Sequence, residues 1–343
     1  MAGRVLGLGD SASRPGWAWW LFVAVAAVGL WLVPDQVDVS VQLDLTIIFV
    51  LALLALSMSF LWGYVGMLSF GQTVFFGLGG YSYAVLGLNI GSTSLPLLVA
   101  VLLPMLFAAV LGYFMIYGRI SDIYLSVITL VVTLIFEKGI RATSGDQFVI
   151  GSVRLNGQNG IPTVPSLQVP WAAGQELATD GVFRLAVVLL ILVYVGLRLL
   201  LTTPFGRVLV GIRENERRIE LLGYDSRRYK LIAFVLAGGI AGLSGALYGI
   251  WGNFVAPEMF NLNQAAQVVI WVIVGGKSTL IGPIVGTGVI QYATAWLGTQ
   301  GVGQVSLILG LVLMVFVLVF QEGLLPTVGL ALGLARDRLR GRR

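Results

Sequence analysis

Long apolar segments alternate with short polar ones along most of the chain. Runs of about 20 apolar residues are long enough to cross the hydrocarbon core of a bilayer as helices. We predict ten such spans and expect glycines to interrupt the third and shorten the eighth. Their approximate limits are 17–33, 45–62, 65–88, 95–117, 122–136, 182–201, 231–251, 264–276, 279–297 and 305–321. The predicted fold class is an all-α polytopic membrane protein with one or two broken or re-entrant spans.

The composition agrees with this pattern and narrows the chemistry. Of the 343 residues, 57% are hydrophobic and 11% are charged, whereas soluble domains have about 25% charged residues. The chain contains neither Cys nor His. Disulfides, thiolate metal sites and imidazole catalysis are therefore excluded. We expect no catalytic residue and no metal site.

The distribution of basic residues predicts the orientation in the membrane. Lys and Arg accumulate in short cytoplasmic loops. With a cytoplasmic N-terminus, 17 of the 21 basic residues fall inside, including the seven from Arg207 to Lys230 and the five in the tail. The external remainder is Lys138, Arg141, Arg154 and Arg184. Both termini are therefore predicted to be cytoplasmic.

These limits divide the chain into a membrane domain and flanking segments. We expect a cytosolic segment at 1–16, a transmembrane domain at 17–325 and a basic cytosolic tail at 326–343. A signal peptide is the alternative for the first span, but Leu32-Val33-Pro34-Asp35 offers no small-residue cleavage site. The external loop 137–181 is rich in Gly and Pro and includes a short predicted hairpin near Val149–Leu155.

The internal loop 202–230 carries an amphipathic helical pattern. Apolar positions and one Asn recur at spacings of four and three, which places them on one helical face. Such a helix could rest on lipid headgroups or dock on a cytosolic partner. Its polar sides mix acidic and basic residues, and this mixture favours docking over a lipid surface. The face comprises Val208, Ile212, Asn215, Ile219 and Leu222.

A glycine-rich run at 66–81 interrupts the third span. Glycine at this density permits close helix packing, or it marks a helix broken at membrane depth. A break has to line a cavity or lie inside protein, because lipid satisfies no backbone groups. We favour a broken segment beside a solute pathway and keep packing as the alternative. The candidate pathway residues are Gln72, Thr73, Phe75, Phe76, Ser126 and Thr129.

Two absences limit the energy source. The sequence Gly276-Lys277-Ser278 resembles the end of a phosphate-binding loop, but Trp271 stands where that motif needs Gly. ATP, if it is used, is therefore bound by another chain. All 16 acidic residues fall in loops or near span ends, whereas proton-coupled carriers commonly keep ionisable groups inside the bundle. Proton coupling is disfavoured.

Four segments resemble the longer permease subunit of bacterial ABC importers for branched-chain (hydrophobic) amino acids. They are Gly66–Tyr81 (GMLSFGQTVFFGLGGY), Asp122–Thr133 (DIYLSVITLVVT), Pro204–Tyr248 (beginning PFGRVLVGIRENERRIELLGYD) and Gly275–Gly286 (GGKSTLIGPIVG). The resemblance runs from about residue 45 to residue 325. Urea and short-chain amide permeases share all four patterns and remain an alternative. The family often has His where this chain has Gln72.

The resemblance implies a multi-pass protein of the bacterial inner membrane with several partners. These are a second homologous permease, two cytosolic ABC ATPases, a periplasmic or exported solute-binding protein and membrane lipid, and nucleic acid is not among them. The chain itself is expected to bind no cofactor, because ATP-Mg binds the ATPases. A membrane-embedded structural or lipid-modifying protein is the alternative of another class. The implied ATPase-coupling residues are Gly206, Val208, Ile212, Arg213, Glu214, Asn215, Glu216, Ile219, Leu222 and Gly223.

Overall fold

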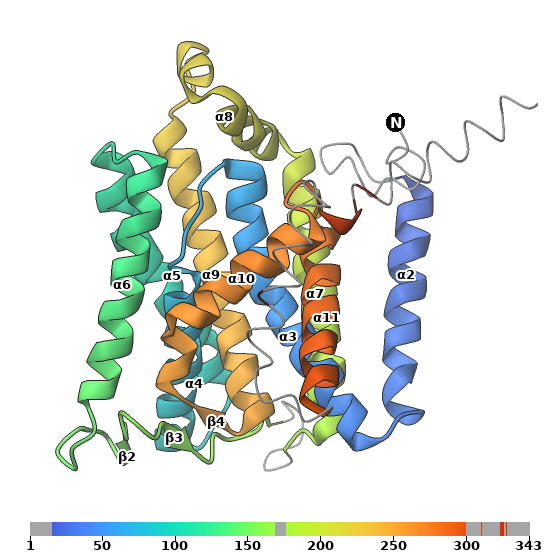
Figure 1. The fold of residues 1–343 in the computed structure, drawn as a ribbon, viewed down its shortest axis with the longest axis vertical. Coiled ribbons are helices and arrows are strands. Elements are labelled where there is room, and N and C mark those ends of the chain that lie inside the picture. The colour runs from blue at the N-terminus through green and yellow to red at the C-terminus, as the bar shows by residue number, and fades with distance from the viewer. Residues whose placement is uncertain (1–15, 169–175, 300–309, 311–322, 326, 328–343) are drawn as a thin grey trace, which may run out of the picture.

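The chain forms a helical bundle with a helical hairpin at one end and short strands at the other (Figure 1). This computed structural model describes residues 16–168, 176–299, 310, 323–325 and 327. The α-helices are α2 (Trp17–Leu32), α3 (Val39–Ser59), α4 (Gln72–Ile90), α5 (Ser94–Tyr117), α6 (Asp122–Ala142), α7 (Thr179–Thr202), α8 (Pro204–Leu221), α9 (Ser226–Gly252), α10 (Leu262–Gly275) and α11 (Ile281–Thr299). The shorter helical segments are η1 (Val33–Asp35), η2 (Phe60–Val65) and η3 (Pro257–Phe260).

The predicted fold class is confirmed, and most predicted spans correspond to helices. Six described helices are long and apolar enough to cross a membrane: α3 with η2, α4, α5, α6, α7 and α9. Helices α2 and α10 are apolar but shorter. At a rise of ~1.5 Å per residue, the 14 residues of α10 extend only about 21 Å. The predicted span 305–321 lies outside the described residues, apart from Gly310.

Helix α9 is the central helix of the bundle and packs most extensively against α4 and α5. Glycine makes this packing possible. A Cβ atom on Gly245 would lie 1.8 Å from the carbonyl oxygen of Phe76, and one on Gly79 would lie 2.1 Å from that of Gly242. The backbones of α4 and α9 therefore come into direct contact at these glycines. The packing alternative for the glycine-rich run is correct for this part of it.

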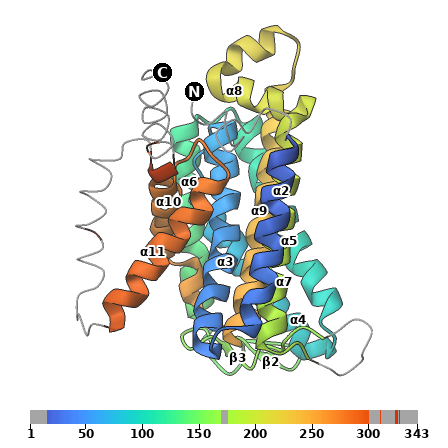
Figure 2. The same cartoon turned by 90° about the vertical axis from the view of Figure 1, so that its right-hand side faces the viewer.

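Peripheral helices complete the bundle. Helix α2 runs beside α7 (Figure 2), where the Trp19 indole Nε1 donates a hydrogen bond to the Tyr194 hydroxyl at 3.3 Å. Helices α10 and α11 pack against each other and against α3. A Cβ atom on Gly286 would lie 2.1 Å from the carbonyl oxygen of Trp271. Small residues again set the closest helix approach.

Two small antiparallel sheets cover the end of the bundle opposite α8 (Figure 1). Strand β1 (Val149–Ile150) pairs with β2 (Val153–Arg154), which confirms the hairpin predicted in this loop. Strand β3 (Ile161–Pro162) pairs with β4 (Phe254–Val255), which follows α9. The long loop after α6 is thereby tied to the connection between α9 and α10.

Helix α6 is longer than the sequence predicts. The expected span ended at residue 136, where the first charged residue follows, but the helix continues to Ala142. Glu137 and Arg141 lie one helical turn apart and form an ion pair at 3.1 Å. Because the two charges partially neutralise each other, the helix continues past the end of the apolar run.

The predicted single apolar face of α8 is wrong. Asn215 has an extended backbone (φ −163°, ψ 95°) that divides α8 into two short helices joined at a kink. The Asn215 side-chain Oδ1 accepts a hydrogen bond from the Arg218 backbone N–H at 2.9 Å. Asn favours this N-cap geometry over a helix interior. The two halves therefore present different faces.

Candidate functional site

A non-helical segment lies inside the bundle between η2 and α4. Helix α3 continues into the π-helix η2, and Gly66 then adopts a left-handed conformation with φ +88°. Residues 67–71 leave the helical path, and α4 starts only at Gln72. In Figure 1 the chain descends along the bundle here before α4 begins. The predicted broken segment is therefore 66–71, whereas residues 72–90 form one uninterrupted helix.

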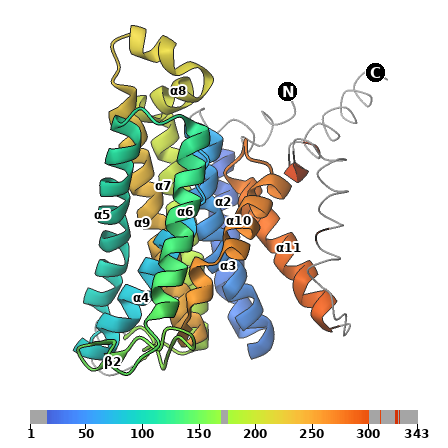
Figure 3. The same ribbon diagram turned by 60° about the vertical axis from the view of Figure 1, so that its left-hand side comes forward.

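Hydroxyl groups of α6 form hydrogen bonds with backbone groups of this segment that have no helical partner. Figure 3 shows α6 running along the side of the bundle. The Ser126 hydroxyl donates to the Leu68 carbonyl at 2.7 Å, and the Phe70 N–H donates to Thr129 Oγ1 at 3.2 Å. The Thr133 hydroxyl also reaches the Phe70 carbonyl, at 3.2 Å. Because lipid offers no hydrogen bonds, these contacts allow the break to persist at membrane depth.

Gln72 is almost completely buried, with 1% of its surface exposed. Its side-chain Oε1 accepts a hydrogen bond from the Ser57 hydroxyl of α3 at 3.1 Å. Its Nε2 has no hydrogen-bond partner among the described residues. A buried amide donor without a partner is rare in folded proteins and commonly marks a site for water or ligand. The amide nitrogen is therefore available to a polar group entering the break.

The structure brings together four of the six predicted pathway residues. Gln72, Ser126 and Thr129 surround the break, and the Thr73 hydroxyl donates to the Phe70 carbonyl within it at 3.1 Å. Phe75 and Phe76 are buried in aromatic contacts and do not line the break. Their partners are Phe107, Phe234 and Tyr248.

Two residues at this site were missed from the sequence. Ser57 and Thr133 contact Gln72 and Phe70 respectively. Thr133 follows Thr129 by four residues, so a polar stripe on α6 is a signal that would have identified it. Ser57 lies in a nearly continuous apolar run, and its role depends on a contact between two helices that the sequence pattern does not specify.

The two halves of α8 form a helical hairpin, called here the α8 hairpin, at the end of the bundle opposite the strands (Figure 1). In its first half, Val208 and Ile212 are buried against the bundle. Gly206 is in tight contact with α7, because a Cβ atom there would lie 2.3 Å from Leu201 Cα. Ile219 in the second half packs back on Gly211. The first half is therefore an anchor and not an open docking face.

Exposed apolar side chains lie instead at the tip of the hairpin. Leu221 is 83% exposed and Leu222 is 67% exposed. Gly223 follows with φ +89°, the left-handed geometry expected just past a helix end. Tyr224 is also exposed. This group, the hairpin tip, is defined by Leu221, Leu222 and Tyr224.

Arg213 connects the hairpin to the broken segment. Its guanidinium Nη1 donates a hydrogen bond to the backbone carbonyl of Gly63 in η2. Its side chain also lies against Gly66, where a Cβ atom would meet Arg213 Cγ at 3.2 Å. Neighbouring Glu214 is an ion-pair partner of Arg213. A displacement of α8 would therefore act directly on the residues that precede the break.

A cavity of about 410 Å³ opens between α8, α9 and the start of α6. Met67 of the broken segment and Leu125 of α6 form its apolar part. Lys230 Nζ lies 2.6 Å from Glu216 and 3.6 Å from Asp122 at its polar end. The broken segment is thus one wall of a space at the hairpin end of the bundle.

Comparison with known proteins identifies the family of this chain. The family described as the branched-chain amino acid transport system permease component matches residues 43–318, which include both the break and the α8 hairpin. The chain belongs to this family. It is therefore a transport subunit, the permease component of an ABC transporter, and a multi-pass protein of the inner membrane.

Individual relatives agree with the family assignment. The high-affinity branched-chain amino acid transport system permease protein LivM of Escherichia coli K12 is 27% identical over 314 residues, covering 82% of this chain and 68% of that protein. The LivM protein of Salmonella typhimurium LT2 is 26% identical, with 89% and 73% covered. The inner membrane ABC transporter permease protein YjfF of E. coli K12 is 29% identical over 47% of this chain and 50% of its own. No solved structure matches the chain significantly.

Replacing Gln72 with Leu is expected to reduce solute uptake by roughly tenfold. The change removes the buried Nε2 donor and leaves the Ser57 hydroxyl without this acceptor, at a cost of about 1–2 kcal/mol. Initial uptake rates at equal amounts of assembled complex measure the effect. The control Leu86→Val, farther along α4, should transport at the normal rate. A normal rate in Gln72→Leu would assign the break to packing alone.

Proposed function

We propose that this permease moves branched-chain and other hydrophobic amino acids into the cell by alternating access, driven by ATP hydrolysis in separate subunits. The observation that carries the proposal is the coincidence of the family match with the break and the hairpin that contacts it. Rigid-body switching of the helices around the break would expose it first to one side and then to the other.

The proposed complex contains a second homologous permease, two cytosolic ABC ATPases and a periplasmic or exported solute-binding protein. ATP-Mg binds the ATPases, and this chain binds no cofactor. The outer side of α6 supports a contact with lipid or the second permease, because apolar residues four apart are exposed along it. These are Ile123, Val127, Val131 and Ile135.

The α8 hairpin is the proposed ATPase-coupling element. Its tip offers Leu221, Leu222 and Tyr224 as an apolar contact. Its first half is held to the bundle by Val208 and Ile212 and reaches η2 through Arg213. Motion of an ATPase that binds the tip would pass through Asn215 and Arg213 to the break. We therefore propose that this loop couples the ATPases to the bundle, as the sequence predicts, but that the ATPases bind the hairpin tip and not the predicted apolar face.

The proposed orientation places 1–16, 202–230 and 326–343 in the cytosol and 137–181 in the periplasm. Because the chain lacks Cys, single cysteines can report accessibility. Ser152 is exposed, but Ser226 is fully buried, so Arg217 is the better internal position. An impermeant thiol reagent on intact cells should label Ser152→Cys and not Arg217→Cys. Labelling at 217 alone would reverse the orientation.

Competition for uptake tests the solute assignment. Cells that depend on the assembled transporter take up labelled leucine, and unlabelled solutes are added in excess. We expect valine and isoleucine to compete strongly and urea or acetamide to have no effect. Competition by urea or acetamide, with none by valine, would transfer the protein to the urea and amide branch.

A further inference from the structure

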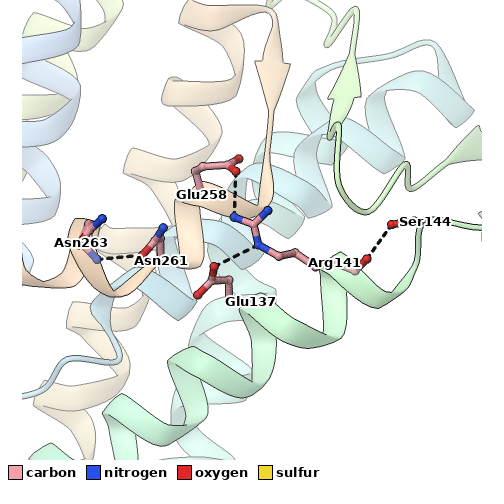
Figure 4. Close-up of polar contacts among 6 residues, drawn as sticks. All are labelled: Glu137, Arg141, Ser144, Glu258, Asn261 and Asn263. Atoms are coloured by element: carbon pink, nitrogen blue, oxygen red, sulfur yellow. Dashed lines mark hydrogen bonds and ion pairs between the residues drawn. The ribbon is translucent and has the colours of Figure 1, made fainter. Parts of the chain in front are cut away.

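A group of three charged residues lies at the strand end of the bundle, far from the coupling hairpin. Arg141 donates from Nε to Glu137 at 3.1 Å and from Nη2 to Glu258 at 2.9 Å (Figure 4). Glu137 and Arg141 belong to α6, whereas Glu258 belongs to η3 between α9 and α10. The ion pair therefore joins two elements that are distant in sequence.

The three groups differ in exposure. The Glu137 side chain is 9% exposed, Arg141 is 30% exposed and Glu258 is 58% exposed. One guanidinium thus bridges an inner carboxylate and an outer one. The outer pair is accessible to a solute arriving from the strand end, and the inner carboxylate holds the Arg141 side chain in place when the outer one leaves.

A cluster of aromatic rings around Phe260 lies beside this ion pair. Phe260, two residues after Glu258, is fully buried. It stacks on Phe136 of α6 with ring centroids 5.9 Å apart and contacts Tyr81 of α4 at 5.5 Å. A Cβ atom on Gly77 would lie 2.3 Å from the Phe260 ring. Glycine in α4 therefore creates the notch that Phe260 fills, between the strand end and the break at 66–71.

Tyr81 adds an unused polar group to the same place. The residue is only 6% exposed, and its hydroxyl has no hydrogen-bond partner among the described residues. The Tyr81 ring contacts Phe260, which follows Glu258 by two residues in η3. A buried donor without a partner is expected to gain one in another state of the protein or from a ligand.

We propose that Arg141, Glu258 and Tyr81 recognise the charged backbone of a zwitterionic amino acid and that the same ion pair keeps the external passage closed when no solute is present. This inference rests on the proposed function. The solute carboxylate replaces Glu258 on the Arg141 guanidinium and accepts a hydrogen bond from Tyr81. The solute ammonium group binds the released Glu258 carboxylate. No covalent bond is made or broken in this exchange, and every charge keeps an opposite partner.

The exchange connects recognition to opening. Release of Glu258 frees η3, and with it Phe260 can leave the notch at Gly77 on α4. A neutral solute such as urea or an amide has no carboxylate to replace Glu258 and no ammonium group to bind it. The site therefore discriminates by charge pairing, because an unpaired charge at a partly buried site is unfavourable.

Two variants and one control test the proposal in the complete transporter, with the amount of assembled complex held equal. Arg141→Gln removes the guanidinium that would bind the solute carboxylate. Glu258→Gln removes the ion pair that closes the passage and also the carboxylate that would bind the solute ammonium group. Leucine uptake should fall at least tenfold in both. Arg154→Gln removes another external ion pair, that with Asp146 at 2.9 Å, and should leave uptake within twofold of the unmodified protein. Normal leucine uptake in Arg141→Gln or Glu258→Gln would overturn the proposal.

Accessibility provides a second measurement that a merely structural role would not change. A cysteine introduced at Thr73, on the far side of Phe260 from the strand end, is treated with an impermeant thiol reagent from outside in the absence of solute. Labelling should become at least fivefold faster when Glu258→Gln is added and should not change when Arg154→Gln is added. An unchanged labelling rate with Glu258→Gln would overturn the closing role, whatever the uptake.

The proposed function and this inference fail in different ways. If the unmodified transporter moves no zwitterionic aliphatic amino acid, the proposed function is wrong. If it moves leucine and the Arg141→Gln variant does so equally well, the proposed function remains and the recognition site is wrong.

Discussion

Replacing Arg213 with Met is expected to uncouple ATP hydrolysis from transport while the ATPases remain bound. The Arg213 guanidinium is the described contact between the α8 hairpin and the Gly63 carbonyl of η2. Met keeps most of the aliphatic volume but donates no hydrogen bond, and loss of a charged hydrogen bond costs about 1.5–3 kcal/mol. We expect leucine uptake to fall by roughly 10- to 100-fold at normal ATPase recovery.

Arg207→Met is the matched control for this experiment. Arg207 is an exposed residue in the same half of α8, so the substitution makes the same change in charge and size away from η2. Its uptake should remain near normal. If Arg213→Met transports as well as Arg207→Met does, the path from hairpin to break does not pass through Arg213.

Replacing Leu222 with Asp is expected to release the ATPases. Leu222 is 67% exposed at the hairpin tip, so the substitution should leave the fold of the isolated permease intact. Burying an unpaired carboxylate in an interface costs about 3 kcal/mol or more, which is roughly a 100-fold loss of affinity. Co-purification of the ATPases with the permease measures this loss, and Leu222→Met should recover them normally.

A variant of Ile219 separates docking from hairpin stability. Ile219 packs on Gly211 inside the hairpin, so Ile219→Asp should lower the thermal stability of the permease as well as ATPase recovery. Leu222→Asp should lower ATPase recovery alone. Normal recovery in Leu222→Asp would show that the ATPases bind a different surface.

Much of the fold could be predicted from the sequence because a bilayer imposes simple rules on length and hydropathy. Apolar runs identified α5, α7 and α9 to within a few residues, and turn residues identified the β1–β2 hairpin. One of the limits failed because side chains pair at the end of a span. At the end of α6, the ion pair between Glu137 and Arg141 stabilises a helical turn beyond the apolar run.

The candidate site was predicted only in part. Gln72, Thr73, Ser126 and Thr129 were identified because polar residues are rare in apolar spans, and the break brings them together. Phe75 and Phe76 were misplaced, since sequence alone does not show whether an aromatic ring faces a passage or another helix. Their contacts with α5 and α9 place both rings in the core.

The coupling loop shows a different limit of sequence patterns. Spacings of four and three predict one helical face only if the helix is continuous. Asn215 ends the first half of α8 by capping the second, so Val208 and Ile212 face the bundle while Leu222 faces outward. The preference of Asn for N-cap positions was a local signal that competed with the apolar periodicity.

ATP-driven accumulation in proteoliposomes tests the central claim most directly. The permease is reconstituted with its homologous partner, the two ATPases and the solute-binding protein, and labelled leucine is supplied on the side of the binding protein. We expect accumulation that requires ATP hydrolysis and is lost when this chain is omitted. Leucine accumulation that persists without this chain, or that a proton gradient drives without ATP, would contradict the account.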